Sequence, residues 1–149
     1  MNIKKWARAA LPAAALLMLL TGCSSLFGPS TEEEMAAVVE AVEASSSDIS
    51  EVRASPAIDG LATFLILTVT MSGDDVSAAQ IDTVLAAATG AIPEDKSRIN
   101  FNVRRSDGLE RIMLMEQARE LGVPEVYFIG DYTLALPLEW LEQNYGSTP

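Results

Sequence analysis

The sequence predicts an α+β fold, a two-layer sandwich in which a mixed β-sheet carries its helices packed on one face. Segments with the apolar spacing of helices alternate along the chain with segments typical of strands. The 149 residues, of which 49% are hydrophobic, suffice for one hydrophobic core but not for two. The central order, helix-strand-strand-helix-strand, is partly ferredoxin-like, which is an analogy of topology that implies no function.

The first predicted helix spans residues 31–44. Met35, Val38, Val39 and Val42 recur along it at the spacing of one helix face. Glutamates at its start complement the positive end of the helix dipole. A short strand near residues 48–54 is expected to follow.

A turn is expected over residues 56–60, and the strongest strand of the chain over residues 61–71. Leu65 and Leu67 lie on one face of this strand, and Phe64 is apolar on the other. Because both faces are apolar in its first half, we expect this strand to be central in the sheet.

The second half of the chain continues the alternation. Ser77 and Gln80 form a capping box at the start of a second helix. A strand is expected over 98–104 with Asn100 and Asn102 outward, followed by a helix from Asp107 to about 121. Residues 126–129 and 132–136 are expected to form a pair of strands, or one strand with a bulge, before a terminal helix over 137–145.

The N-terminus has the features of a secretory signal. Basic residues precede an apolar run of twelve residues, 9–20, which rises roughly 18 Å as a helix and is too short to span a bilayer. Leu20-Thr21-Gly22-Cys23 follows directly. This segment resembles the lipobox of the bacterial lipoprotein family, in which Leu, a small residue and Gly or Ala precede Cys.

The resemblance implies cleavage between Gly22 and Cys23 and a diacylglyceryl group on the Cys23 thiol. The chain would then be attached to the cell membrane through lipid, on the extracytoplasmic face. The expected organisation is a signal peptide over 1–22, a lipidated tether over 23–30, a single domain over 31–146 and a tail over 147–149.

Composition excludes several function classes. The chain has no His and one Cys, which excludes His-based triads, Cys/His zinc sites and an intrachain disulfide. Residues 23–149 carry seven Lys and Arg against 21 Asp and Glu, a net charge of −14. Since this charge repels nucleic acid and anionic lipid headgroups, we expect no nucleic-acid partner and attachment by the lipid alone.

Several polar clusters are candidates for chemistry. Asp74 and Asp75 could offer oxygen ligands to Ca²⁺, but a solvated acidic loop is their expected role. The loop acids Asp74 with Asp75, Glu94 with Asp95, and Asp131 could also serve as paired acids in a hydrolase, although such pairs are expected by chance in a chain this acidic. Lys96 stands beside Ser97, where we expect a solvated loop lysine rather than a catalytic dyad. We therefore predict no catalytic residue, metal or cofactor.

Arg104 and Arg105 are the only adjacent basic pair after the signal segment. They could contact an anionic ligand or a partner's carboxylate, or could pair with the surrounding acids. The aromatic residues of the last quarter, Trp140 among them, are expected to pack the terminal helix on the sheet.

The function that these observations predict is a non-catalytic, lipid-anchored domain that binds a protein partner or assists an envelope complex. A small-ligand or Ca²⁺-binding module is the alternative. A hydrolase that uses paired acids ranks below both.

Overall fold

The computed structural model describes residues 31–146. The predicted signal peptide, the predicted cleavage site at Gly22, the predicted lipidation site at Cys23, the expected tether and the expected tail lie outside the described residues. The described elements are α1 (Thr31–Glu43), β1 (Ile49–Asp59), β2 (Ala62–Met71), α2 (Ala78–Thr89), β3 (Arg98–Arg104), α3 (Met115–Glu120), a 3-10 turn η1 (Glu125–Tyr127), β4 (Phe128–Ile129), β5 (Thr133–Pro137) and α4 (Leu138–Tyr145).

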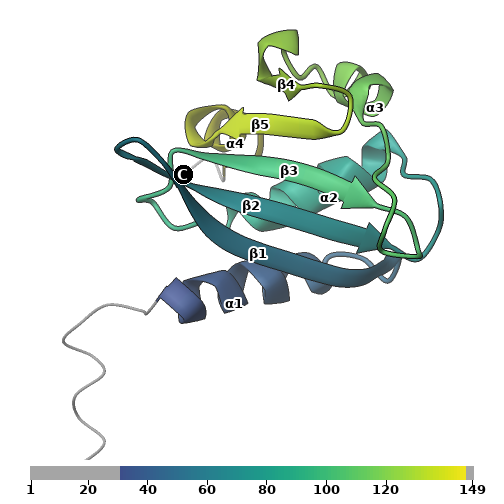
Figure 1. Ribbon diagram of the computed structural model, residues 1–149, viewed down its shortest axis with the longest axis horizontal. Coiled ribbons are helices and arrows are strands. Elements are labelled where there is room, and N and C mark those ends of the chain that lie inside the picture. The colour runs from purple at the N-terminus through teal and green to yellow at the C-terminus, as the bar shows by residue number, and fades with distance from the viewer. Residues whose placement is uncertain (1–30, 147–149) are drawn as a thin grey trace, which may run out of the picture. The chain divides into compact units, whose positions relative to one another are not determined.

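The strands form one mixed sheet in the order β1-β2-β3-β5-β4. β2 and β3 are parallel, and the other neighbouring pairs are antiparallel (Figure 1). The α+β prediction is confirmed, and β2 is an interior strand as expected. The ferredoxin-like order is not confirmed, because β2 and β3 are direct hydrogen-bonded neighbours and no other strand splits them.

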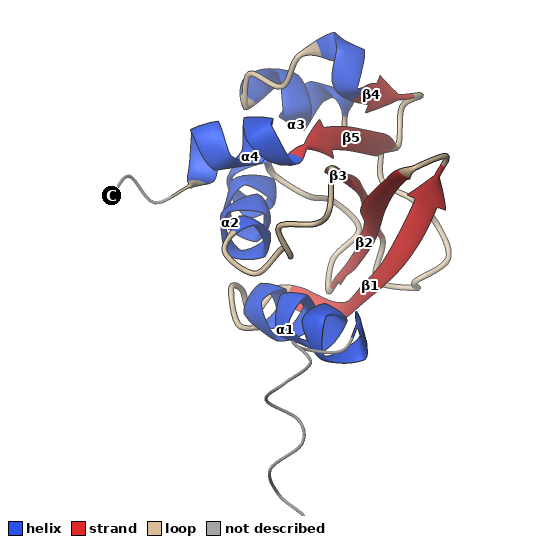
Figure 2. Cartoon of the chain, turned by 90° about the vertical axis from the view of Figure 1, so that its left-hand side faces the viewer, coloured by secondary structure: helices blue, strands red, loops and turns tan. Residues whose placement is uncertain are grey.

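The helices α1, α2 and α4 lie along one face of the sheet (Figure 2). The core fills the space between these two layers. Alternate residues of β2 and β3 point into it, and its largest fully buried side chains include Leu65, Leu67, Leu85, Ile99, Phe101, Leu134, Leu136 and Leu141. The period-2 pattern read from the sequence of β2 and β3 therefore describes their buried face.

β1 is longer than the sequence predicted. The expected turn at residues 56–60 is wrong in its first part, because Pro56 pairs with Leu65 inside the β1–β2 ladder. Proline lacks an N–H donor and is tolerated on an edge strand such as β1. The turn itself consists of Gly60 and Leu61, between the paired residues Asp59 and Ala62.

The helix expected from Asp107 to about 121 is confirmed only over Met115–Glu120. Residues before it extend the sheet instead: Ile112 N–H donates to the Val103 carbonyl (2.9 Å) and Arg105 N–H to the Glu110 carbonyl (2.9 Å). β5 pairs with β3 only as far as Phe101, so the end of β3 presents unpaired backbone groups that this segment satisfies.

Asn102 also differs from expectation. It projects from β3 on the face opposite Phe101, as predicted, but is only 6% exposed. Its side-chain carbonyl accepts a hydrogen bond from Thr68 Oγ1 (3.0 Å), so this buried amide is partly satisfied across the β2–β3 pair. By contrast, the capping box of α2 is present as predicted, with Ser77 accepting from Gln80 N–H.

Candidate functional site

The structure separates the predicted Arg104–Arg105 pair. Arg104 is the last residue of β3, and its Nη1 donates to the Gly108 carbonyl (2.8 Å), which holds the following turn. Arg105 forms an ion pair with Glu110 (3.2 Å). Of the two arginines, only Arg105 lines a groove. Arg104 instead stabilises the turn after β3 through its bond to Gly108. Of the two roles predicted for these arginines, ion pairing with a nearby acid is the one that Arg105 shows within the domain.

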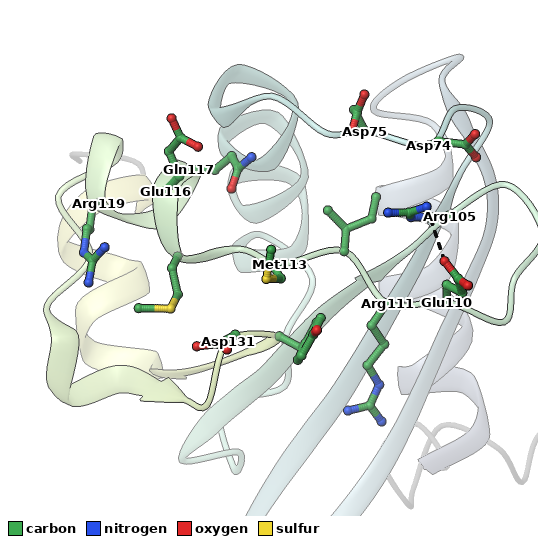
Figure 3. A pocket seen from close by; sticks show the side chains of 13 residues that line it. Asp74, Asp75, Arg105, Glu110, Arg111, Met113, Glu116, Gln117, Arg119 and Asp131 are labelled. Carbon is green, nitrogen blue, oxygen red and sulfur yellow. Dashed lines mark ion pairs between the residues drawn. The ribbon is translucent and has the colours of Figure 1, made fainter.

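The groove lies at the end of the sheet where β2 and β3 finish (Figure 3). It encloses about 750 Å³, a volume within the range of known ligand sites. Its lining comprises Asp74, Asp75, Arg105, Glu110, Arg111, Ile112, Met113, Met115, Glu116, Gln117, Arg119, Asp131 and Tyr132.

Four segments meet to form this groove. They are the loop after β2, the extended segment after β3, the helix α3 and the turn between β4 and β5. Backbone and side-chain hydrogen bonds hold them together: Leu114 N–H donates to the Asp131 carbonyl (2.8 Å), and Ser106 Oγ donates to the Asp74 carboxylate (2.9 Å). The groove is therefore built by tertiary contacts among segments far apart in the sequence.

Charge in the groove is negative on balance. Five carboxylates and three guanidinium groups line it. Arg105 is neutralised by Glu110, and Arg119 pairs with Glu125 outside the lining (2.9 Å). Glu116 and Asp131 form no ion pair within residues 31–146, so their negative charges are available to a bound group.

Apolar side chains are exposed among these charges. Met113 is 60% exposed and Tyr132 is 41% exposed, and both line the groove. Figure 3 shows Met113 between Gln117 and Arg111. The amide of Gln117 donates to the Val76 carbonyl (3.2 Å), while its buried Oε1 has no hydrogen-bond partner in the described part of the chain. The site thus combines an apolar centre with a charged rim.

Asp74 and Asp75, the candidate Ca²⁺ ligands, both line the groove. Asp74 is engaged by the Ser106 hydroxyl. Across residues 31–146, no three Asp, Glu, Cys or His side chains are grouped closely enough to hold a metal ion.

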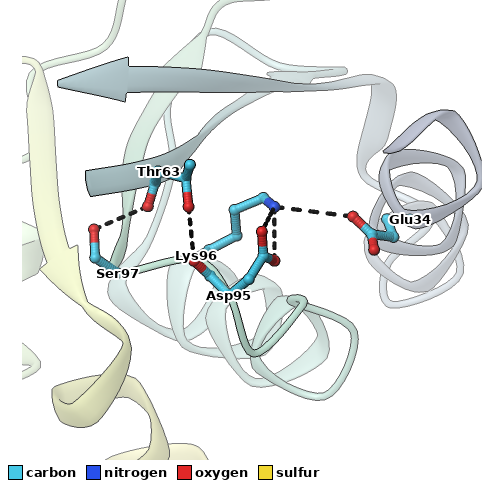
Figure 4. Close-up of polar contacts among 5 residues, drawn as sticks. All are labelled: Glu34, Thr63, Asp95, Lys96 and Ser97. Carbon is cyan, nitrogen blue, oxygen red and sulfur yellow. Dashed lines mark hydrogen bonds and ion pairs between the residues drawn. The ribbon is translucent and has the colours of Figure 1, made fainter. Parts of the chain in front are cut away.

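The prediction of a solvated loop lysine at Lys96 is wrong. Lys96 is 5% exposed, and its Nζ lies 2.6 and 2.7 Å from the two Asp95 carboxylate oxygens and 3.9 Å from Glu34 (Figure 4). Ser97 Oγ instead donates to the Thr63 carbonyl (2.9 Å). The buried lysine therefore connects α1 to the loop before β3 and forms no pair with Ser97.

The aromatic residues divide between two roles. Trp140 makes edge-to-face contacts with Tyr127 (ring centroids 6.4 Å apart) and with Tyr145 (6.1 Å). These contacts pack α4, as the sequence predicted. Tyr132 alone among the described tyrosines lines the groove.

Sequence reasoning missed Arg111, Met113 and Glu116 as groove residues, because it placed them in the continuous helix after Asp107. One signal was available: the apolar residues of that segment spread over half of the supposed helix, with Arg111 among them. Gly108, which adopts a positive φ of 69°, is a second signal against a helix there.

The fold and the site together define a small α+β domain with an open groove of mixed charge at one end of its sheet. Comparison of the chain with known protein families, with characterised proteins and with solved structures finds no match. No helix within residues 31–146 is both long enough and apolar enough to cross a bilayer.

Proposed function

We propose that this chain is a lipid-anchored extracytoplasmic domain, non-catalytic, that binds a protein partner in the groove. The observation that carries the proposal is the groove itself, in which exposed Met113 and Tyr132 lie among five carboxylates and three guanidinium groups. Methionine and tyrosine are enriched in protein interfaces, and both are exposed in this groove.

Charge complementarity specifies the partner further. Asp75, Glu116 and Asp131 present negative charge around Met113, and the domain as a whole is acidic. A partner segment that carries Lys or Arg beside an apolar side chain satisfies both features of the groove. An anionic partner would meet repulsion from these carboxylates.

The anchor rests on the sequence. Leu20-Thr21-Gly22-Cys23 after an apolar run supports cleavage before Cys23 and acylation of its thiol. Each buried CH₂ of an acyl chain contributes about 0.8 kcal/mol, so two or three chains hold a protein stably at a membrane. An acidic domain attached in this way stays at the surface without help from anionic lipid.

The test is in-cell photo-crosslinking through an unnatural amino acid at Met113. We expect a discrete adduct with one envelope protein, identified by mass spectrometry. The same probe at Val126, which is 82% exposed but lies outside the groove lining, should give no such adduct. An adduct of equal yield at both positions would exclude the groove as the binding site.

Charge-reversed variants then test the chemistry of the partner. Glu116→Lys should reduce the Met113 adduct at least several-fold, whereas Glu120→Lys, an exposed control outside the lining, should leave it unchanged.

A Cys23→Ala variant tests the anchor in the same cells. It should escape cleavage at Gly22–Cys23 and lose acylation; unaltered processing would show that the lipoprotein assignment is wrong.

A further inference from the structure

Two large aliphatic side chains project into solvent at the tip of the β1–β2 hairpin. Leu61 is 106% exposed and Ile58 is 75% exposed. The tip is a two-residue turn in which Gly60 adopts a positive φ of 62° at the first central position, as in a type II′ turn. Such a turn fixes the direction of the hairpin and presents Leu61 at its end.

The hairpin tip lies at the same end of the domain as the N-terminus of α1. Thr63, two residues after the turn, donates from Oγ1 to the Asp95 carbonyl (2.7 Å), and Lys96 next to it lies against Glu34 in the first turn of α1 (3.9 Å). Figure 4 shows this chain of contacts, and Figure 1 shows α1 beginning on the side of the hairpin tip. Thr31, the first described residue, therefore lies at this end of the domain.

The groove lies at the opposite end of the sheet. β2 starts at the hairpin tip, and β3 runs parallel to it. The groove is lined by residues that follow the ends of both strands, such as Asp75 and Arg105. The domain therefore has two poles. One pole carries Thr31 and the hairpin tip with Ile58 and Leu61, and the other carries the groove.

The inference rests on the proposed lipid anchor. If Cys23 is acylated, eight residues, Cys23 to Ser30, connect the lipid to α1. A fully extended chain of that length spans at most about 28 Å. The hairpin tip is thus held near the bilayer at a high effective concentration, which favours even a weak second contact.

We propose that Ile58 and Leu61 insert into the headgroup region of the bilayer that holds the anchor and orient the groove away from the membrane. Aliphatic side chains gain free energy on leaving water there. Charge at this pole is partly compensated, because Asp59 pairs with Arg98 (3.3 Å). The glutamates of the first turn of α1 remain negative, so the matching surface is zwitterionic rather than anionic lipid.

The experiment uses the chain as cells that express the full sequence process it, extracted and reconstituted in phosphatidylcholine vesicles. Because Cys23 is the sole cysteine and acylation consumes it, Leu61→Cys supplies one free thiol for an environment-sensitive fluorophore. Leu109→Cys is the matched control, since Leu109 is 80% exposed and follows the end of β3. We expect the probe at residue 61 to emit at shorter wavelength and to be quenched several-fold more by phosphatidylcholine brominated near the headgroup.

Vesicle flotation, read on the same samples, separates the two proposals. If the chain floats and the two probes behave alike, the membrane contact is wrong and the anchor stands. If the probe at residue 61 is shielded only when the partner crosslinked at the groove is added, the tip is a protein contact and the inference is again wrong. If the chain does not float, both the anchor and the contact that rests on it are wrong.

Discussion

The Asp107 carboxylate accepts hydrogen bonds from the backbone N–H groups of Leu109 (2.8 Å) and Glu110 (3.2 Å). These bonds stabilise the ionised form and lower the pKa of Asp107, with a smaller contribution from the positive charge of Arg105. The sequence indicated Asp107 as a helix cap. The same side-chain chemistry caps a turn instead, because an Asp that accepts from N–H groups two and three residues on serves either structure.

Asp107→Asn should make stability less sensitive to acid. The folded-state pKa of Asp107 lies below its unfolded value, so its contribution is present at neutral pH and is lost as pH falls below about 4. Asn accepts the same hydrogen bonds but does not titrate. Urea unfolding at a series of pH values between neutral and acid should show a smaller loss of stability for the variant than for the wild type.

Glu120→Gln is the control for this measurement, because Glu120 is exposed and its side chain accepts no backbone hydrogen bond among those of residues 31–146. An acid dependence of Asp107→Asn identical to that of the wild type would show that the turn does not depend on the charge of Asp107.

At the scale of elements, two long-range polar contacts fasten helices to the rest of the domain. Lys96 joins α1 to the loop before β3, and Tyr145 Oη at the end of α4 donates to Asp82 of α2 (3.0 Å). Burial, together with the Asp82 carboxylate, raises the pKa of Tyr145. The apolar faces of these helices were predictable from the sequence. That Lys96 contacts Glu34 and that Tyr145 contacts Asp82 was not predictable, because the partners are far apart in the chain.

Lys96→Met should lower the free energy of unfolding by about 2 kcal/mol, the value typical of a hydrogen bond to a charged group. Methionine retains the apolar length of the side chain but loses the bonds to Asp95 and Glu34. Both carboxylates keep some contact with water, which limits the loss. Equilibrium unfolding in urea gives the comparison.

Arg53→Met is the matched control, since Arg53 forms an ion pair with Glu51 (2.8 Å) but its side chain is 72% exposed. An exposed pair of this kind contributes less than about 1 kcal/mol. Equal effects of the two substitutions would mean that the buried position of Lys96 adds nothing to the attachment of α1.

The whole domain combines two distinct poles with a large negative charge. Residues 31–146 contain seven Lys and Arg against 21 Asp and Glu, a net charge of −14. Six ion pairs are found in this part of the chain, and most of their members are largely exposed. Since more carboxylates remain than these pairs can neutralise, self-repulsion opposes the compact state.

Added salt should therefore stabilise the domain. Raising ionic strength from about 0.01 M to 0.15 M shortens the screening length from about 30 Å to about 8 Å. The midpoint of urea unfolding should rise as repulsion between carboxylates is screened. A triple variant of exposed residues, Glu40→Lys, Glu120→Lys and Glu142→Lys, lowers the net charge to −8 and should show a smaller rise.

A decrease of the midpoint on adding salt to the wild type would contradict this expectation. It would show that attractive ion pairs outweigh the repulsion.

Much of the fold follows from local patterns. The bounds of β3 and nearly those of α1 and β2 were predictable from apolar spacing, and the α2 capping box from Ser77 and Gln80. The groove could not be predicted from local patterns to the same extent. Asp74, Asp75 and Arg105 were identified as individual candidates, but that they share one site depends on contacts across some 30 residues of sequence.

The sequence by itself determined the class of the fold, the excess of acids and the Leu20-Thr21-Gly22-Cys23 segment on which the proposed anchor rests, because each is a property of composition or of residues close in the chain. Tertiary structure decided the burial of Lys96, the length of β1 and the extended course of residues 110–112. The physical reason is the backbone at the end of β3: its groups, which β5 leaves unpaired, are satisfied by the Arg105–Glu110 and Val103–Ile112 hydrogen bonds, and a helical course of residues 110–112 would not supply these bonds. This competition opens the segment, and the groove forms beside it.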